Sequence, residues 1–476
     1  MPNPKSQIPS TGLGPKSQIP SPALGSKSQI PNPAFPGVRA LVVGMAKSGV
    51  ASVELLVKHG ALVRATDLSP VPLEVSRELE QVHTPFALQS PEVFESADLI
   101  VLSPGVPADL EPLEAARNRG ATVMGEVELA SYFLKGPIIG ITGSNGKTTT
   151  TALVGHILRE SGIAVQVGGN IGTAVTAMID SSGPDQWNVL ELSSFQLETI
   201  CQFRAQIAVA LNVTPDHLDR HHTFENYAAA KGRLFETQQE GDTAVLNADD
   251  PVCVSYASLT KGGPFWFSST HAVSPGISLQ DGELWFDGVR MMPAAEIPIR
   301  GLHNVENTMA AAAAGRLAGA SLAQIAAAVR TFRAVEHRLE FVRNVSGVDF
   351  YNDSKATNVD ATRKALDAFA GGLWVILGGK DKGSDYTALR QPLTQKARGV
   401  MLIGAAAEKI RGQIDGAAPL YESKTLDVAL RDAYAAAQPG DTVLLAPACA
   451  SFDQFDNYEH RGRVFKTLVA QLEPKN

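Results

Sequence analysis

Short apolar runs recur along the chain and alternate with stretches in which apolar residues repeat at helical spacing. An unbroken apolar run is typical of a strand buried on both faces of a parallel sheet, and the helical spacing indicates helices that cover those faces. The pattern therefore predicts α/β domains built on parallel sheets. The expected strands are 38–43, 61–66, 99–102, 138–141, 189–192, 207–211, 245–246, 350–351, 373–377, 400–403 and 443–445.

The stretch 264–298 departs from this pattern. It has short alternating segments separated by Asp281-Gly282 and Asp287-Gly288, which are typical of hairpin turns. We therefore expect an antiparallel insert there. Breaks near Lys135 and Arg333 divide the ordered part into three predicted domains, 37–135, 136–333 and 334–476.

Residues 1–36 form a different kind of sequence. They contain no Asp or Glu and repeat Lys-Ser-Gln-Ile-Pro three times at a spacing of eleven residues. Proline at this spacing is incompatible with a helix. We expect a solvated, extended and disordered tail.

Composition narrows the class of protein. The chain of 476 residues has 41 Lys and Arg against 49 Asp and Glu, a net charge of −8, which disfavours bulk binding to nucleic-acid phosphates. Its three cysteines are scattered, so neither a disulfide framework nor a thiolate metal site is indicated. No apolar run approaches the roughly 18–20 residues that span a bilayer. We expect a cytoplasmic monomer with no nucleic-acid partner and no membrane insertion.

The strongest local signal follows the strand expected at 138–141. Between that strand and a helical pattern lies Gly143-Ser144-Asn145-Gly146-Lys147-Thr148-Thr149. Glycine lets the backbone approach phosphate oxygens, and the helix N-terminus presents free N–H groups to an anion. Lys147 would reach the β- and γ-phosphates of a nucleotide, and the Thr148 hydroxyl would bind Mg²⁺. The usual spacing has glycine where this chain has Ile141, so a purely structural turn is the alternative.

Two further residues follow expected strands at the same sheet edge. Glu191 comes at the end of the strand at 189–192, and a carboxylate there either binds a metal or caps a helix. His217 follows the strand at 207–211. It could bind a metal, hydrogen-bond a substrate or lie on the surface, and its position alone does not decide between these roles.

Lys231 lies on an apolar helix face. An inward ammonium must be paired, reach water along its stem, or lose its charge, and desolvation lowers the pKa of lysine. Snorkelling to water is the ordinary explanation. The apolar residues on this face are Phe224, Tyr227, Ala228, Leu234 and Phe235.

The sequence resembles the ATP-dependent Mur ligases of peptidoglycan precursor synthesis. The resemblance rests on the phosphate loop, on Glu191-Leu192-Ser193-Ser194-Phe195-Gln196-Leu197 and on Asn212-Val213-Thr214-Pro215-Asp216-His217-Leu218-Asp219. The shortened phosphate loop of the family also accounts for Ile141. Other motifs resemble the branch that adds D-glutamate: Leu102 to Pro107, Gly301 to Asn307, Glu336-His337-Arg338, Asn352 to Asn358, Leu377 to Gly383, Ser451 to Phe455 and Tyr458 to Gly462. The matching motifs run in order from Val38 to the C-terminus.

The resemblance implies a fold and a reaction. The fold would be an N-terminal Rossmann-like parallel sheet, a central P-loop ATPase-like α/β domain and a C-terminal Rossmann-like α/β domain. ATP would drive amide formation between UDP-N-acetylmuramoyl-L-alanine and D-glutamate through an acyl phosphate. Two Mg²⁺ sites are implied, one at Thr148 and Glu191 and one at His217 and a carbamylated Lys231. Carbamylation would explain the inward lysine. The implied catalytic residues are Lys147, Glu191, His217 and Lys231.

The resemblance also assigns binding residues. The implied ATP contacts are Gly143, Ser144, Asn145, Gly146, Lys147, Thr148, Thr149, Asn304, Asn307, Arg338, Asp353 and Lys355. The UDP contacts would be Ser48, Asp67, Ser103 and Gly105, and the muramoyl contacts Asn170 and His217. The D-glutamate contacts would be Thr357, Lys382, Ser451, Phe452 and Tyr458. Because Lys355 and Lys382 must approach Lys147, we expect the C-terminal domain to close on ATP.

Other functions fit parts of the sequence. The segment 44–49 nearly matches a dinucleotide-binding fingerprint, but Ala46 replaces its middle glycine. An NAD-dependent dehydrogenase would not need the phosphate loop, Glu191 or Lys231. A nucleotide-sensing protein or a sibling ligase for another amino acid, folate ligases included, would use much of the same site.

Overall fold

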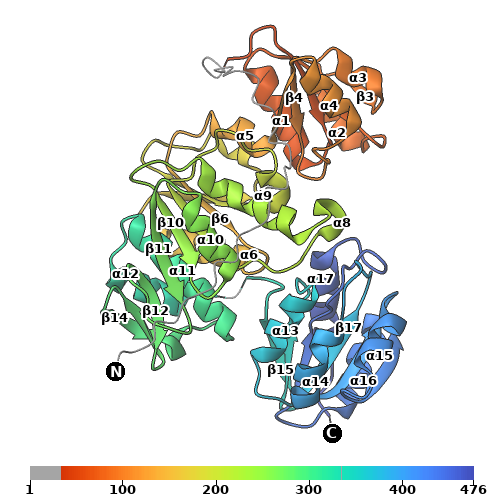
Figure 1. Cartoon of the computed structure of the whole chain (residues 1–476). Helices are drawn as coiled ribbons and strands as arrows, with labels where there is room; N and C mark the ends of the chain where they lie inside the picture. The colour runs from red at the N-terminus through yellow and green to blue at the C-terminus, as the bar shows by residue number, and fades with distance from the viewer. Residues whose placement is uncertain (1–33, 334, 476) are drawn as a thin grey trace, which may run out of the picture.

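A computed structural model describes residues 34–333 and 335–475. Three α/β domains follow one another along the molecule, with the central domain between the other two (Figure 1). Residues 1–33 of the predicted tail lie outside the described residues. The predicted end of the tail at residue 36 is too late, because Phe35 is buried and its N–H donates to the His59 carbonyl (2.9 Å). Within the described residues, no helix combines the length and apolar character needed to cross a bilayer.

The N-terminal sheet has the order β3-β2-β1-β4-β5 with all pairs parallel. Helices α1 and α2 pack on one face and α3 and α4 on the other, so that β4 is buried throughout. The elements are β1 Arg39–Val43, α1 Lys47–Lys58, β2 Leu62–Asp67, α2 Leu73–Gln81, β3 Phe86–Leu88, α3 Pro91–Glu95, β4 Leu99–Leu102, α4 Glu111–Asn118, β5 Thr122–Gly125 and α5 Glu126–Ser131.

The central sheet has the order β14-β13-β12-β11-β10-β9-β6-β8-β7. Helices α6, α11 and α12 cover one face, and α7, α9 and α10 cover the other. The elements are β6 Ile138–Thr142, α6 Lys147–Glu160, β7 Val165–Gly169, η1 Val175–Met178, β8 Trp187–Glu191, α7 Ser194–Leu197, β9 Ile207–Ala210, α8 Leu218–His221, α9 Phe224–Glu236, β10 Thr243–Asn247, α10 Pro251–Ser255, η2 Tyr256–Ser258, β11 Gly263–Ser268, β12 Gly276–Gln280, β13 Glu283–Phe286, β14 Val289–Pro293, η3 Ala294–Glu296, α11 Leu302–Leu317 and α12 Leu322–Thr331.

The expected antiparallel insert at 264–298 is only partly correct. Strand β11 pairs parallel with β10, and β12 pairs parallel with β11; only β13 and β14 are antiparallel. Asp281-Gly282 and Asp287-Gly288 do form the two hairpin turns, with positive φ at all four residues. No such turn joins β11 to β12, and this stretch extends the central sheet.

The C-terminal sheet has the order β15-β16-β20-β17-β18-β19, parallel except for the β15–β16 pair. Helices α13, α14 and α15 pack on one face, and α16 and α17 on the other. The elements are β15 Glu340–Val345, β16 Val348–Asn352, α13 Val359–Asp367, β17 Leu373–Gly378, η4 Thr387–Leu389, α14 Arg390–Lys396, β18 Ala397–Ile403, α15 Ala407–Ile414, β19 Leu420–Lys424, α16 Leu426–Ala436, β20 Thr442–Leu445 and α17 Tyr458–Ala470.

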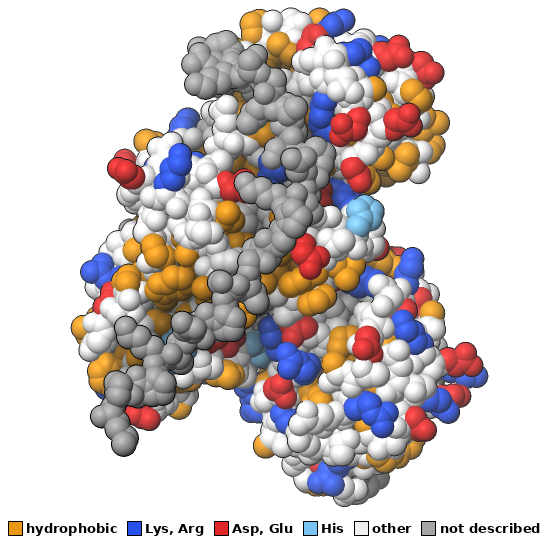
Figure 2. Space-filling model, in the orientation of Figure 1, with side chains coloured by type: hydrophobic (Ala, Val, Ile, Leu, Met, Phe, Trp, Pro, Cys, Tyr) orange, Lys and Arg blue, Asp and Glu red, His pale blue; other side chains and the backbone are white. Residues whose placement is uncertain are grey.

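Basic and acidic side chains are interspersed over the three domains on the face that Figure 2 shows. Apolar side chains lie among them in small groups.

Candidate functional site

The phosphate loop joins β6 to α6 at the carboxyl edge of the central sheet. Gly143 and Gly146 have φ of 151° and 87°, a region that favours glycine. A Cβ atom on Gly146 would lie 2.2 Å from the Asn307 side-chain oxygen. The N-terminus of α11, which carries Asn304 and Asn307, therefore lies directly against the loop.

Neighbouring segments hold the loop in place. The Asn145 N–H donates to the Asn212 side-chain oxygen (2.9 Å), and the Asn212 amide donates back to the Asn145 carbonyl (3.1 Å). The Ser144 hydroxyl donates to the Thr214 carbonyl (2.9 Å) and shares a 3.0 Å hydrogen bond with the Tyr227 phenol. These bonds fix the loop conformation within the protein itself.

Two lysines converge on one carbonyl oxygen. Lys147 and Lys231 both donate to the Gly143 carbonyl, at 2.8 and 2.9 Å. Burial lowers the pKa of each ammonium, and that of Lys231 falls well below its usual value, with the Lys147 charge as a further cause. Lys231 is therefore the group whose neutral amine the site favours.

The helix pattern around Lys231 is confirmed. Helix α9 follows the N-cap Thr223, and Lys231 is only 1% exposed. Its ammonium lies 4.5 Å from the centroid of the Tyr227 ring. The side chain does not snorkel to water, so the ordinary explanation for an inward lysine is excluded here.

Glu191 lies at the end of β8 and is buried. One carboxylate oxygen accepts a hydrogen bond from the Asn170 amide (3.0 Å), and the other has no hydrogen-bond partner among the described residues. A buried carboxylate oxygen without a partner is costly unless it binds a cation. This oxygen and the Thr148 hydroxyl are the donor types that Mg²⁺ prefers.

The C-terminal domain reaches the loop directly. The Arg338 guanidinium donates to the Thr148 hydroxyl, and the Asn145 amide donates to Asp360 (2.8 Å). A cavity of about 60 Å³ lies between the two domains. Its lining includes Asn145, Gly146, Thr149, Asn304, Asn307, Arg338, Asp353 and Lys355. The structure thus brings together residues of the expected ATP set from both domains.

Asp216 joins the His217 segment to the C-terminal domain. Its carboxylate accepts from the Asn358 amide (3.0 Å) and lies 3.8 Å from the Lys382 ammonium. His217 has φ of 53° at the N-cap of α8, and its ring lies 4.9 Å from the Phe195 ring. Burial lowers the pKa of His217. A neutral imidazole is the form that can bind a metal.

Lys355, Tyr458 and Asp353 form a second group on the C-terminal side. The Lys355 ammonium lies 3.7 Å from the centroid of the Tyr458 ring, and burial lowers the pKa of Lys355 to about 8. Burial raises the pKa of Asp353 to about 7, although the Arg338 charge opposes that shift. Asp353 and Lys355 both line the cavity between the two domains.

The raised pKa of Asp353 predicts a pH-dependent stability. The native state binds the Asp353 proton more tightly than the unfolded chain, whose aspartate has a pKa of 3.8. Native stability is therefore lost as the pH rises from about 4 to about 7. We expect Asp353→Asn to remove this loss and to be more stable than the wild type at pH 8 by about 4 kcal/mol.

Thermal unfolding at pH 4.5 and pH 8 checks this expectation. The exposed Asp432 of α16 provides the control variant Asp432→Asn. An equal difference between Asp353→Asn and the wild type at both pH values would contradict the raised pKa.

The remaining expected D-glutamate residues lie in the C-terminal domain but are not all in contact. Ser451 is buried, and Arg461 connects its segment to the 354–355 segment, because the guanidinium donates to the Ser354 hydroxyl (2.9 Å) and the Cys449 carbonyl (3.2 Å). The Thr357 N–H donates to the Lys355 carbonyl (2.7 Å). Phe452 is 66% exposed.

The expected UDP residues gather at the carboxyl edge of the N-terminal sheet. The Met45 N–H donates to Asp67 (2.6 Å), and the Ser103 hydroxyl donates to the Gly44 carbonyl (2.7 Å). Ser48 donates to Ser103 (3.4 Å), and Gly105 is exposed on the same loop.

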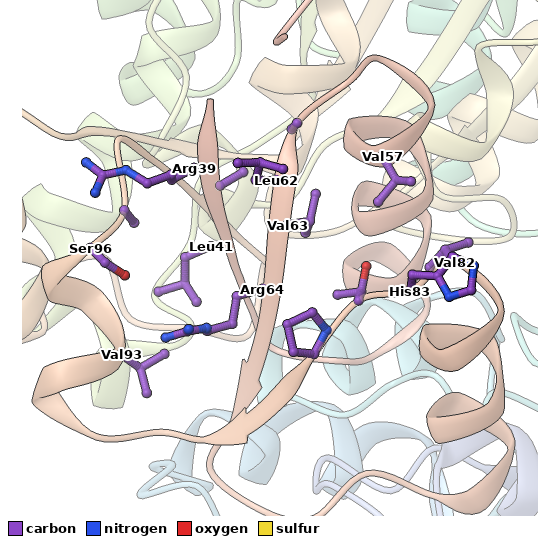
Figure 3. A pocket seen from close by; sticks show the side chains of 15 residues that line it. Arg39, Leu41, Val57, Leu62, Val63, Arg64, Val82, His83, Val93 and Ser96 are labelled. Carbon is purple, nitrogen blue, oxygen red and sulfur yellow. The ribbon is translucent and has the colours of Figure 1, made fainter. Parts of the chain in front are cut away.

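A larger cavity of about 400 Å³ lies in the N-terminal domain (Figure 3). Arg39 of β1, Arg64 of β2 and Val93 of α3 contribute to its lining, and Arg39 is paired with Asp98 at 2.6 Å. Its lining comes from the first residues of β1 and β2 and from the segments 82–85 and 93–97, and it lies at the other end of the strands from Asp67. The cavity is separate from the expected UDP residues.

One cluster resembles a metal site by geometry alone. Glu336, His337 and Glu340 bring ligand atoms within 4.8 Å of one another. The Lys466 ammonium contacts Glu336 (2.6 Å) and Glu340 (2.9 Å). This lysine already compensates the carboxylate charges, so the cluster is explained as an ion-pair network.

Comparison with known families identifies the chain. The Mur ligase MurD-like N-terminal domain matches residues 38–125, the Mur ligase middle domain 141–315 and the Mur ligase glutamate ligase domain 337–449. The chain therefore belongs to the Mur ligase family, a family of ATP-dependent ligases.

Individual relatives extend this result. A UDP-N-acetylmuramoylalanine–D-glutamate ligase of Solibacter usitatus is 68% identical over 92% of this chain and 99% of its own length. The protein of the same name from Acidobacterium capsulatum is 52% identical over 91% of this chain and 96% of its own. The solved structure of MurF ligase from Thermotoga maritima in complex with ADP has a TM-score of 0.59 at 16% identity, covering 92% of this chain and 96% of that one. The last similarity concerns the fold.

Proposed function

We propose that this protein joins D-glutamate to UDP-N-acetylmuramoyl-L-alanine, with ATP hydrolysed to ADP and phosphate. The observation that carries the proposal is the convergence of Lys147, Lys231 and the phosphate loop with residues of the C-terminal domain. The names of the relatives at 68% and 52% identity support the choice of amino acid and nucleotide. The enzyme is proposed to act as a cytoplasmic monomer.

The proposed chemistry follows from the carboxylate substrate. A carboxylate is a poor acyl donor because its leaving group would be oxide, whereas an acyl phosphate releases phosphate. The γ-phosphoryl group of ATP passes to the carboxylate, and the amine of D-glutamate then displaces phosphate and loses a proton. Lys147, whose ammonium donates to the Ser144 carbonyl of the phosphate loop (2.9 Å), would neutralise the two anions that must meet.

The metal sites are proposed from the donor types. Thr148 and Glu191 would hold one Mg²⁺, and His217 and a carbamylated Lys231 would hold the second. Bound Mg²⁺ supplies charge neutralisation at the phosphates. Carbamylation requires a neutral amine, which attacks CO₂ and loses a proton to leave an anionic oxygen ligand. The lowered pKa of Lys231 supports this modification.

The substrate contacts are proposed in three groups. The phosphate loop with Asn304, Asn307, Arg338, Asp353 and Lys355 would bind ATP. The UDP moiety would lie at Ser48, Asp67, Ser103 and Gly105, and the muramoyl part at Asn170 and His217. D-Glutamate would lie near Thr357, Lys382, Ser451, Phe452 and Tyr458, with Lys382 opposite a carboxylate. The division of the chain at residues 135/136 and 333/334 is part of the same proposal.

Phosphate release tests the proposed function. Purified protein is supplied with ATP, the muramoyl nucleotide and one amino acid from a panel that includes D-glutamate, L-alanine, L-lysine and meso-diaminopimelate. We expect D-glutamate alone to stimulate release. Stimulation by L-lysine or meso-diaminopimelate instead would assign a sibling activity, and ATP binding without release under all conditions would indicate a nucleotide sensor.

A further inference from the structure

Helix α5 carries two buried carboxylates at the junction of the N-terminal and central domains (Figure 1). It begins directly after β5, the last strand of the N-terminal sheet. Glu128 is fully buried and accepts four hydrogen bonds. The donors are the N–H groups of Cys201 (2.8 Å), Gln202 (2.8 Å) and Phe203 (3.0 Å) and the Tyr132 hydroxyl (2.6 Å).

The three N–H donors belong to the central domain, in the segment between α7 and β9. This segment is connected to both sides of the candidate site. The preceding helix α7 begins three residues after Glu191. Arg233 lies two residues after Lys231 on α9. Its guanidinium donates to the Ile200 carbonyl (2.6 Å). Glu128 therefore contacts a segment whose position is tied to both Glu191 and Lys231.

Glu126 makes the second connection. Its carboxylate accepts from the Thr176 N–H (2.7 Å) and the Thr176 hydroxyl (3.0 Å). Thr176 lies in η1, which follows the loop that carries Asn170, and Asn170 donates to Glu191. The two carboxylates of α5 thus contact one segment that precedes β8 in the sequence and one that follows it.

At the same junction, the backbone at Gly125 lies close to the central domain. A Cβ atom on Gly125 would lie 2.1 Å from the Thr199 hydroxyl. Helix α1 also packs against η1 in a shared apolar cluster, but apolar packing is not directional. Among the polar contacts, the Lys58–Asp180 pair is largely exposed, and Arg220 donates one hydrogen bond to the Val106 carbonyl. Exposed ion pairs contribute little, whereas buried charge-assisted hydrogen bonds are strong and directional.

We propose that Glu126 and Glu128 are positioning residues that set the orientation of the UDP-binding domain on the central domain. They thereby set where the carboxylate of the muramoyl substrate lies relative to the phosphate loop. The inference rests on the proposed function for the identity of that substrate. Neither side chain is expected to touch substrate, because each is buried and accepts hydrogen bonds from backbone N–H and hydroxyl donors.

Glu128→Gln tests the proposal with little change in shape. The variant replaces one acceptor oxygen by an NH₂ group that faces N–H donors, so at least one of the buried bonds is lost. We expect the KM for the muramoyl nucleotide to rise by about tenfold, with the Kd for ATP unchanged. Hydrogen–deuterium exchange of the intact chain should become faster at 201–203, and small-angle scattering should show a wider range of arrangements of the N-terminal domain.

Asp242→Asn is the matched control. Asp242 is a buried carboxylate that accepts from Arg204 (2.7 and 2.8 Å) and the Gln239 N–H (2.7 Å), all within the central domain. We expect this control to lower the melting temperature without changing the KM for the nucleotide. If Glu128→Gln does not fold, Glu126→Gln is measured in its place, with exchange monitored at Thr176.

Two results would overturn the proposal. One is an unchanged KM together with unchanged exchange; the other is an equal loss of ATP and nucleotide affinity, which would indicate general destabilisation. Exchange and scattering need no turnover. They therefore test the role of α5 even if the wild-type protein fails to use D-glutamate.

Discussion

Replacing Lys231 by alanine is expected to lower kcat by a factor on the order of 10²–10³. The variant loses the group proposed as an anionic ligand and leaves a cavity beside the Tyr227 ring and the Gly143 carbonyl. Formate and acetate are small, and each carries a carboxylate whose oxygens can replace the proposed metal-binding oxygens of the carbamate. We expect them to restore part of the activity of Lys231→Ala when added at millimolar concentration.

Phosphate release with and without the carboxylates measures the effect. The exposed Lys261, replaced by alanine, controls for loss of a positive charge elsewhere in the central domain. Mass spectrometry of the intact wild-type protein under CO₂ should reveal a carbamate that the variant lacks. Full activity of Lys231→Ala would exclude a role for the residue as a ligand.

Glu191→Gln is expected to change stability and activity in opposite directions. One oxygen of this buried carboxylate has no partner among the described residues. Removing the charge therefore relieves a desolvation cost when no cation is bound, and the melting temperature in EDTA should rise. The same change removes the proposed Mg²⁺ ligand, so kcat should fall by a factor on the order of 10²–10³.

Thermal unfolding with ATP, in EDTA and in Mg²⁺, separates the two effects. A ligand that binds only the native state raises its stability, so Mg²⁺ should raise the melting temperature of the wild type more than that of Glu191→Gln. Asn188, which precedes Glu191 on the same strand and bonds to Gly136 (3.1 Å), gives the control variant Asn188→Ala. An identical Mg²⁺ response in the wild type and Glu191→Gln would argue against the proposed ligand.

The sequence predicts the interior strands better than the edges. The expected strands at 99–102, 138–141 and 373–377 match buried strands to within one residue. The strands without a sequence prediction are β3, β5, β7, β15 and β19, and each lies at the edge of its sheet. Edge strands are covered on fewer sides, so their sequences carry more polar residues and a weaker apolar pattern.

In the candidate site, too, some features could be predicted from the sequence and others could not. Lys147, Glu191 and Lys231 could be identified because each stands in a motif or breaks a local pattern, and the structure brings their segments together. Asp216 lies in a recognised motif, but its contacts with Asn358 and Lys382 come from another domain. Such contacts depend on how the domains pack, which local periodicity does not encode.

Other residues that contact the candidate site or its supporting segments could not be identified from the sequence. Asp360 stands in the first turn of α13, where an acidic residue is common for helix stability alone, yet it accepts from Asn145 across the domain boundary. Glu128 is one of several acidic residues on its segment and becomes distinctive only through burial. From sequence alone a charged residue is expected to be exposed to solvent, and only the tertiary structure shows that it is buried.

The alanine-rich helix α11 is held rigidly against α6, next to the phosphate loop. Its buried run at 309–315 allows close contact with α6, and a Cβ on Gly315 would lie 2.8 Å from Ile157. The helix ends that present Lys147 and Asn307 are thus parts of one stiff body. Under the proposed function, the nucleotide contacts on the phosphate loop and α11 would keep their relative positions when the C-terminal domain moves, whereas those at Arg338, Asp353 and Lys355 would move with that domain.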